Sequence, residues 1–139
     1  MSRLKDKKIL VTGGSGFIGS HLTRRLCCEG ADVAILCKYD SVMDNVRLVD
    51  LWSDITVLEA DIRNQDSLRQ IGDFKPDIIY HLAAYNHVGD SFLHVSEAMD
   101  SNARGTANVI ESYDGYERFV YIATSEVYGR QDEVPFRED

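Results

Sequence analysis

The glycines between Gly13 and Gly19 are the residues of this chain best suited to binding a phosphate anion. Gly14, Gly16 and Gly19 fit the Gly-x-Gly-x-x-Gly fingerprint, and Gly13, Gly16 and Gly19 fit its Gly-x-x-Gly-x-x-Gly variant. Glycine permits a tight strand-to-helix turn and a close approach of the main chain to a pyrophosphate, which the N–H groups at the start of the helix then bind. An apolar segment precedes the turn and helical spacing of apolar residues follows it. The pattern therefore predicts a dinucleotide site rather than a glycine-rich surface loop.

Two other segments carry groups suited to hydrogen bonding and acid–base chemistry. Thr124, Ser125 and Glu126 place two hydroxyls beside a carboxylate. Glu126 is either a general base or a surface glutamate that follows a strand. Asp61 is either an acceptor for an amine of a ligand or the N-cap of a helix.

Metal-binding patterns are missing from the sequence. His87 and His94 are isolated from carboxylates at ligand spacing, and Cys27, Cys28 and Cys37 have no metal-site spacing. We predict no metal site and interpret both histidines as hydrogen-bonded or solvated. Tyr128 is interpreted as packing within a loop.

Strand and helix patterns alternate along the chain and must position these groups. Strands are expected over residues 8–12, 32–37, 55–60, 78–82 and 118–123, with a loop and short helix over 38–53 and a short helix around 67–71. The first helix follows the glycines and ends at Gly30. A long helix is expected to carry one face made up of Val95, Ala98, Met99, Asn102, Thr106, Val109, Ile110 and Tyr113. Asn102 lies on that face and is expected to be buried and bonded to the backbone.

This rhythm predicts an α/β fold of the Rossmann type, a doubly wound parallel sheet of five strands in the order 3-2-1-4-5 flanked by helices. Ligands of such sheets bind at the carboxyl ends of the strands. The glycine turn, Cys37 and Lys38, Asp61 and Ile62, residues 83–86 and residues 124–126 all follow a strand, so we expect them along one edge.

Composition restricts the partners. The 139 residues form one domain with a net charge of −8, and no basic block supports a nucleic-acid or anionic-membrane partner. No signal peptide or membrane-spanning segment is predicted. Three cysteines without an evident disulfide pairing favour the reducing cytoplasm.

Five motifs together resemble the extended short-chain dehydrogenase/reductases, and within them the NAD(P)-dependent nucleotide-sugar epimerase/dehydratase family. They are TGGSGFIGSHL, ADIRN, HLAA, NARGTANVIES and TSEVYG, beginning at Thr12, Ala60, His81, Asn102 and Thr124. The resemblance covers the chain in order. It implies an enzyme with a bound NAD or NADP and a nucleotide-sugar substrate.

The resemblance also implies roles for individual residues. Asp61 would accept a hydrogen bond from the adenine amine, the Ile62 backbone N–H would face the ring, and residues 82–85 would line the ribose and nicotinamide. The implied cofactor residues are Gly13, Ser15, Gly16, Phe17, Ile18, Gly19, Lys38, Asp61, Ile62, Leu82, Ala83, Ala84 and Tyr85.

The end of the second strand bears on the choice of cofactor. NAD-binding proteins of this fold usually place a carboxylate there for the ribose hydroxyls, whereas this chain has Cys37 followed by Lys38. The pair tolerates a 2′-phosphate, which gives a slight preference for NADP. Lys38 is alternatively a solvated lysine, and Asp40 is an alternative acceptor.

Residues 85–92 are similar to a segment of the sugar-nucleotide 4,6-dehydratases. His87 and Ser91 match that segment and are implied substrate residues, as is Thr124, whose hydroxyl would bond the sugar 4-OH. The implied catalytic residues are Thr124, Ser125 and Glu126, with Glu126 removing the C5 proton after oxidation at C4 and before water leaves from C6. A 4-epimerase of the same family is the alternative.

No Tyr-x-x-x-Lys sequence, the catalytic pair of the family, occurs in the chain. We therefore expect residues 1–139 to form an incomplete NAD(P)-binding domain that ends before the later strands and lacks the C-terminal substrate domain. Such a chain would bind the cofactor without turnover, and a non-catalytic dinucleotide-binding module is the other possibility. The resemblance implies a homodimer for the full-length form.

Overall fold

The structure is a computed structural model that describes residues 3–39, 46–130, 132 and 134–138. Its parallel sheet has the order β3-β2-β1-β4-β5, which confirms the predicted doubly wound topology. The strands are β1 (Lys8–Thr12), β2 (Asp32–Cys37), β3 (Thr56–Glu59), β4 (Ile78–His81) and β5 (Arg118–Tyr121).

Three strands end before their predicted limits. Ala60, Leu82 and Ile122 each donate one last backbone hydrogen bond to the neighbouring strand, at 3.0, 3.2 and 3.1 Å. Beyond that bond the backbone leaves the sheet, so the apolar side chains that follow are part of the edge loops. Apolar character continues past the strand because these residues line the carboxyl edge.

The two faces of the sheet have separate cores because side chains alternate along each strand. Leu10, Leu36 and Ile79 belong to one core, together with Leu68 and Ile71. Ile9, Val11, Val33 and Ile35 belong to the other, together with Leu26 and Leu48. Burial on both faces explains why the strands are continuously apolar.

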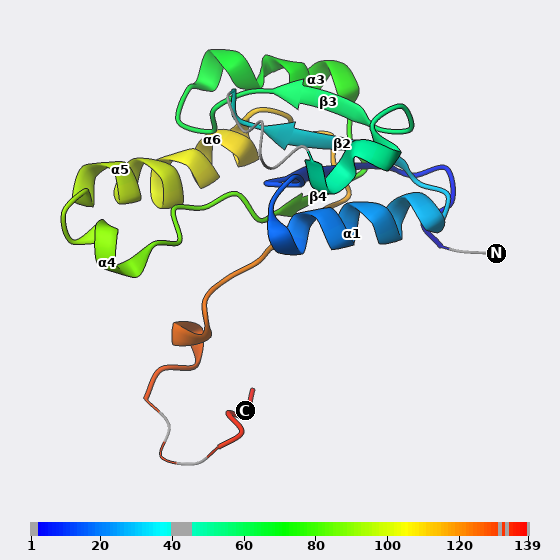
Figure 1. Cartoon of the computed structure of the whole chain (residues 1–139). Coiled ribbons are helices and arrows are strands. Elements are labelled where there is room, and N and C mark those ends of the chain that lie inside the picture. The colour runs from blue at the N-terminus through cyan, green and yellow to red at the C-terminus, as the bar shows by residue number, and fades with distance from the viewer. Residues whose placement is uncertain (1–2, 40–45, 131, 133, 139) are drawn as a thin grey trace.

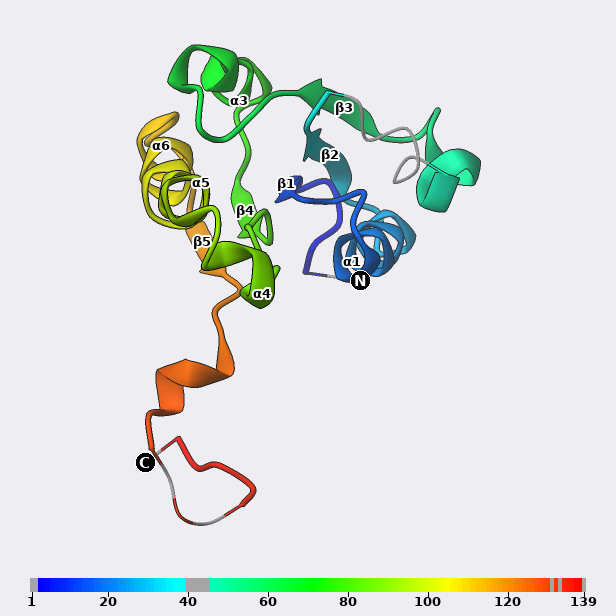
Figure 2. The same ribbon diagram turned by 60° about the vertical axis from the view of Figure 1, so that its left-hand side comes forward.

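Helices cover both faces, as Figures 1 and 2 show. Helix α1 (Phe17–Cys28) lies on one face, and η1 (Val46–Leu51), a 3-10 helix, contacts α1. On the other face lie η2 (Gln65–Leu68), α3 (Arg69–Phe74) and the long helix that precedes β5. Helix α1 ends as predicted, with Glu29 as its C-cap and Gly30 at a φ of 82°.

The long helix differs from its prediction. It consists of α5 (Val95–Met99), a π-helical turn η3 (Asp100–Arg104) and α6 (Gly105–Glu111), and it follows the short α4 (Val88–Ser91). The wide π turn shifts the phase of the residues before it relative to those after it. The single apolar stripe was therefore wrong: Val109 is buried, whereas Val95, Met99 and Ile110 are exposed. Asn102 is also exposed, which corrects its predicted burial.

Beyond β5 the chain leaves the sheet, and the orange and red segment in Figure 1 extends away from it. This segment contains a 3-10 turn, η4 (Ser125–Tyr128). The ring of Tyr128 packs against Phe136 with 5.9 Å between centroids. Among the described residues, no helix has the length and apolarity needed to cross a membrane.

Candidate functional site

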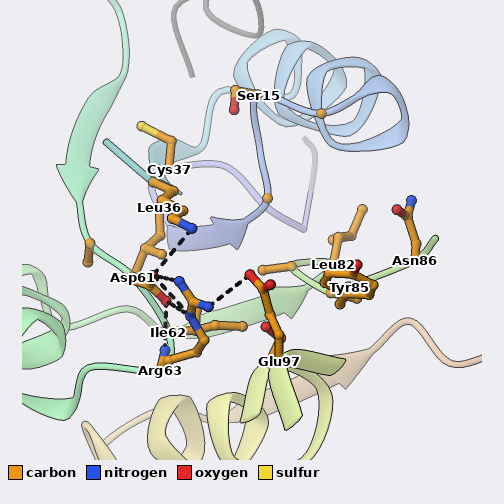
Figure 3. A pocket seen from close by; sticks show the side chains of 17 residues that line it. Ser15, Leu36, Cys37, Asp61, Ile62, Arg63, Leu82, Tyr85, Asn86 and Glu97 are labelled. Atoms are coloured by element: carbon orange, nitrogen blue, oxygen red, sulfur yellow. Dashed lines mark hydrogen bonds and ion pairs between the residues drawn. The ribbon is translucent and has the colours of Figure 1, made fainter. Parts of the chain in front are cut away.

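A cavity of about 410 Å³ opens at the carboxyl edge of the sheet (Figure 3). It lies where β1 is flanked by β2 and β4, with the glycine turn at one side and residues 82–86 at another. Most of the predicted cofactor residues line it, namely Gly13, Ser15, Gly16, Lys38, Asp61, Ile62, Leu82, Ala83, Ala84 and Tyr85. The topology thus brings together segments that are distant in the sequence.

Three predicted cofactor residues are not among those that line the cavity. Phe17 and Ile18 begin α1 with exposed side chains, and Gly19 is buried behind the turn. Asp40, the alternative acceptor, lies outside the described residues.

The glycine turn is compact because its backbone folds onto itself and lies against β2 and the loop that follows β4. Gly13 has a φ of 68° and donates a 3.0 Å hydrogen bond to the Leu36 carbonyl, while Gly16 donates to the Gly13 carbonyl at 3.1 Å. A Cβ on Gly13 would lie 3.0 Å from the Ala83 nitrogen, and a Cβ on Gly19 would collide with the Gly13 carbonyl oxygen. The turn therefore requires glycine at both positions.

The carboxylate of Asp61 is held by Arg63, a residue that the sequence reasoning did not select. The Arg63 backbone N–H donates to Oδ1 at 3.0 Å, Nε donates to Oδ1 at 3.0 Å and to Oδ2 at 3.1 Å, and Nη2 donates to Oδ2 at 2.6 Å. The hydrogen bond from the Arg63 side chain lowers the pKa of Asp61 to about 2. Asp61 is therefore ionised at neutral pH and acts as an acceptor.

Two more charged residues extend this cluster around the cavity. Nη1 of Arg63 donates to Oε1 of Glu97 on α5 at 3.0 Å, and Nζ of Lys38 lies 3.6 Å from Oδ2 of Asp61. Figure 3 shows Arg63 between Asp61 and Glu97. Arg63, Asn86, Glu97 and Ser101 also line the cavity. Asn86 belongs to the residues already expected at this edge, and the Asp-x-Arg spacing could have indicated Arg63, whereas no pattern in the sequence indicates Glu97 or Ser101.

A buried hydrogen-bond network lies behind the cavity and connects β1, β4 and α6. Oγ1 of Thr12 accepts from the backbone N–H groups of Leu82 and Ala83 at 3.2 and 3.1 Å, which occupies its lone pairs. Its proton therefore faces Nδ1 of His81, 2.7 Å away. Nε2 of His81 then carries the ring proton and donates to Oγ1 of Thr106 at 3.0 Å.

This network requires a neutral His81. The side chain is 1% exposed, and its burial lowers the pKa from 6.5 to about 4. The network fixes the backbone at Leu82 and Ala83, where the loop that lines the cavity begins.

A second cavity, of about 690 Å³, continues from the first because both are lined by Leu82, Ala84, Tyr85 and Asn86. The predicted substrate residues His87, Ser91 and Thr124 line it. Asn102 holds the loop between the cavities: its side chain accepts from the Tyr85 N–H at 2.7 Å and donates to the Tyr85 carbonyl at 3.0 Å. The predicted backbone bonding of Asn102 is thus present.

The predicted catalytic triplet is not assembled into this cavity. Thr124 contributes to its lining, but Ser125 and Glu126 do not, and all three are exposed. Oγ1 of Thr124 accepts from the Glu126 backbone N–H at 3.3 Å and caps the turn η4. Glu126 therefore lies apart from the carboxyl-edge groups in this conformation.

The remaining polar candidates have local positions. Nδ1 of His87 lies 3.8 Å from Oδ2 of Asp90, and His94 is the N-cap residue of α5 without a side-chain capping bond. In the part of the chain that the structure describes, no group of three or more His, Cys, Asp or Glu residues is placed to hold a metal ion.

Comparison with known proteins places this geometry in a family context. Residues 9–139 match the NAD dependent epimerase/dehydratase family. The bifunctional UDP-glucose 4-epimerase and UDP-xylose 4-epimerase 1 of Pisum sativum is 34% identical over 144 residues, covering 96% of this chain and 41% of that protein. The dTDP-D-glucose 4,6-dehydratase of Dictyostelium discoideum is 36% identical over 130 residues, covering 88% of this chain and 30% of that protein.

A solved structure has the same arrangement of elements. The UDP-glucose-4-epimerase of Stenotrophomonas maltophila, with bound NAD and formylated UDP-arabinopyranose, aligns with a TM-score of 0.83 and 28% identity over 95% of this chain and 41% of that chain. This chain thus spans 30% to 41% of the length of these three proteins.

Proposed function

Since the chain belongs to the NAD-dependent epimerase/dehydratase family, we propose that it binds NAD or NADP in the cavity of about 410 Å³ and is the cofactor-binding part of a nucleotide-sugar 4,6-dehydratase. The observation that carries the proposal is the convergence of the glycine turn, Asp61 and the loop 82–85 on this cavity. Its residues supply an anion-binding turn at one place and an acceptor for an amine at another.

The residues of the cavity fit such a cofactor. The glycine turn leaves a backbone cradle that a Cβ at Gly13 would strain, and such a cradle suits a pyrophosphate. Asp61, held ionised by Arg63, suits the adenine amine. When bound, the nicotinamide would accept a hydride from the substrate. Phe17, Ile18 and Gly19 are proposed to contribute through the backbone of the turn and the start of α1.

We propose a slight preference for NADP over NAD. Cys37 is buried and offers no carboxylate to the adenosine ribose, whereas Lys38 brings a cation to the wall of the cavity. Its ammonium group lies 3.6 Å from Asp61 Oδ2, at the same end of the cavity as the proposed adenine site. A 2′-phosphate near this position would gain an ion pair with Lys38.

The proposed substrate is a nucleotide-sugar in the second cavity. Thr124 would bond the sugar 4-OH, with His87 and Ser91 lining the same space. Glu126 would take the C5 proton, which is acidified once C4 is a ketone, and the C6 hydroxyl would leave as water. The hydride removed from C4 would then return to C6 and a proton to C5, which gives the 4-keto-6-deoxy sugar. This chemistry requires the segment after β5 to fold back, because Glu126 is exposed outside the cavity.

A 4-epimerase is the second candidate reaction, favoured by its frequency among the similar proteins. The Thr-Ser-Glu triplet favours the dehydratase, since C4 epimerisation needs no base for the C5 proton. We propose that residues 1–139 are the cofactor domain alone and that a tyrosine–lysine pair and a substrate domain complete the enzyme. By itself the chain would then bind the cofactor without turnover. A non-catalytic dinucleotide-binding module would have the same cofactor site.

Two experiments test the function. Isothermal titration calorimetry of the 139-residue chain with NAD and with NADP should detect binding, and a Gly13→Val variant should lose it. Residues 1–139 can also be joined to the C-terminal part of the Dictyostelium dehydratase and incubated with UDP-, GDP-, dTDP- and CDP-sugars. We expect a 4-keto-6-deoxy product that disappears in a Glu126→Gln chimera, whereas a C4 epimer as the sole product would contradict the dehydratase.

We further propose a homodimer for the complete protein and a cytoplasmic location. Val95, Met99 and Ile110 expose apolar side chains on the long helix, which a second copy could cover. None of Cys27, Cys28 and Cys37 forms a disulfide, which suits a reducing compartment.

A further inference from the structure

Arg63 contacts both sides of the cavity of about 410 Å³, and the role given to it so far is only to keep Asp61 ionised. Its guanidinium donates to Asp61 in the same loop and to Glu97 on α5, at 2.6 Å and 3.0 Å for the closest pairs. All three residues line the cavity, and their side chains are partly buried. Arg63 therefore fixes the orientation of the Asp61 carboxylate relative to the cavity wall.

Counting donors shows how much of this carboxylate is available to a ligand. A carboxylate has about four lone-pair positions. The backbone N–H, Nε and Nη2 of Arg63 provide three hydrogens, with Nε shared between the two oxygens. Three hydrogens for about four positions leave the carboxylate able to accept one further hydrogen bond. The Lys38 ammonium, 3.6 Å from Oδ2, is too far away to make that bond, so a ligand can donate it.

We propose that Arg63 is a positioning residue that makes the cavity selective for a purine with a donor at C6. Fixed by Arg63, Asp61 presents one acceptor position and no donor to the cavity. An amino group at C6, as in adenine, donates to that position. A carbonyl at C6, as in hypoxanthine, would place an acceptor against it and leave both groups unpaired. This inference rests on the proposed binding of a dinucleotide in the same cavity.

Without Arg63 the carboxylate would lose its fixed plane and would be free to rotate toward other donors. The purine could then shift so that N1–H of hypoxanthine, a donor, meets Asp61. Selectivity between the two bases should therefore decrease even if the cavity and the fold are preserved. Lysine at this position would keep the charge but lose the two-point fork of the guanidinium.

The test compares NAD with nicotinamide hypoxanthine dinucleotide, in which an oxygen replaces the amine at C6. Isothermal titration calorimetry of the 139-residue chain should give a dissociation constant for NAD lower by about tenfold or more. In Arg63→Gln the ratio of the two constants should fall to within about threefold, and Arg63→Lys should restore part of it. Arg69→Gln is the matched control, because Arg69 pairs with Asp66 on the surface, away from the cavity.

An Asp61→Asn variant gives a second measurement, since its amide can donate to a C6 carbonyl and should bind the hypoxanthine cofactor at least as tightly as NAD. Circular dichroism melts confirm that each variant folds. If the unaltered chain binds NAD yet shows the same ratio as Arg63→Gln, the role of Arg63 is wrong and the cofactor site stands. If the chain binds neither dinucleotide, the proposed function itself fails and this inference with it.

Discussion

Nδ1 of His81 accepts a 2.7 Å hydrogen bond from the hydroxyl of Thr12, and this contact joins β1 to β4 at the base of two loops that line the cavity of about 410 Å³. Thr12 precedes the glycine turn, and His81 precedes the loop that begins at Leu82. This buried contact therefore connects the starting points of the two loops, in addition to the backbone pairing of β1 with β4.

Protonation of His81 should destabilise the fold in mildly acidic solution. The pKa of His81 is about 4 in the folded chain and 6.5 when unfolded, so only the unfolded state gains a proton between these values. Stability should be fully present above about pH 7, fall by about 2 kcal/mol between pH 7 and pH 5, and continue to fall toward pH 4. Urea unfolding at several pH values measures this, and His81→Asn should show a flatter pH dependence. Identical slopes for the two proteins would contradict the prediction.

Replacing the hydroxyl of Thr12 with a methyl group should lower the free energy of unfolding by more than the small change in size suggests. Thr12→Val leaves the Ala83 N–H and Nδ1 of His81 without their partner in a buried place, and we expect a loss of about 2 to 3 kcal/mol in urea unfolding. Thr12→Ser, which keeps the hydroxyl, should recover most of this loss.

Thr23 on α1 serves as the control, because removal of its hydroxyl should change the stability in the opposite direction. Its side chain is 0% exposed, and Oγ1 has no hydrogen-bond partner within the described part of the chain. Thr23→Val removes an unsatisfied hydroxyl at constant shape and should stabilise the chain by about 1 kcal/mol. A similar loss of stability in Thr12→Val and Thr23→Val would show that the hydrogen bonds around His81 do not contribute to the free energy of unfolding as proposed.

Two helical glycines should respond to alanine with opposite signs. A Cβ at Gly19 would collide with the Gly13 carbonyl, so Gly19→Ala should destabilise the chain by about 2 kcal/mol or more and abolish dinucleotide binding. At Gly72, on α3, the nearest atom to a Cβ is the Ser112 carbonyl oxygen at 3.7 Å. Gly72→Ala should therefore stabilise the chain by up to about 1 kcal/mol. Thermal melts and titration with NAD measure both effects, and equal behaviour of the two variants would refute this account of the turn.

The charge of Lys38 should control the choice between the two cofactors. Lys38→Glu places a carboxylate where the 2′-phosphate of NADP is proposed to lie, and it should weaken NADP binding by about tenfold or more while NAD binding changes little. Competition titrations at low and moderate salt measure the ratio of the NAD dissociation constant to the NADP dissociation constant. For the unaltered chain this ratio should fall as salt rises, because the lysine is largely exposed. An unchanged ratio in the variant would place the 2′-phosphate elsewhere.

The sequence predicted the sheet order and the glycine turn, and most of the residues that it assigned to a cofactor line the cavity of about 410 Å³. Each depends on a local pattern: apolar runs mark buried strands, and glycine at fixed spacing marks the turn. Once parallel strands alternate with helices, few topologies remain, and their carboxyl ends share one edge. The positions of Asp61, Lys38 and residues 82–85 follow from that edge.

Contacts between distant side chains were beyond such patterns. Arg63 and Glu97 are 34 residues apart, and His81 meets Thr12 across 69 residues, so their pairing depends on how α5 and β4 pack. The π turn at Asp100–Arg104 altered the apolar face of the long helix, and the segment after β5 left Glu126 outside the cavity. Periodicity reports which side of an element is apolar. The partner of a polar side chain is decided by the packing of elements, because a hydrogen bond needs its two atoms within about 3 Å in space rather than at a fixed spacing in the sequence.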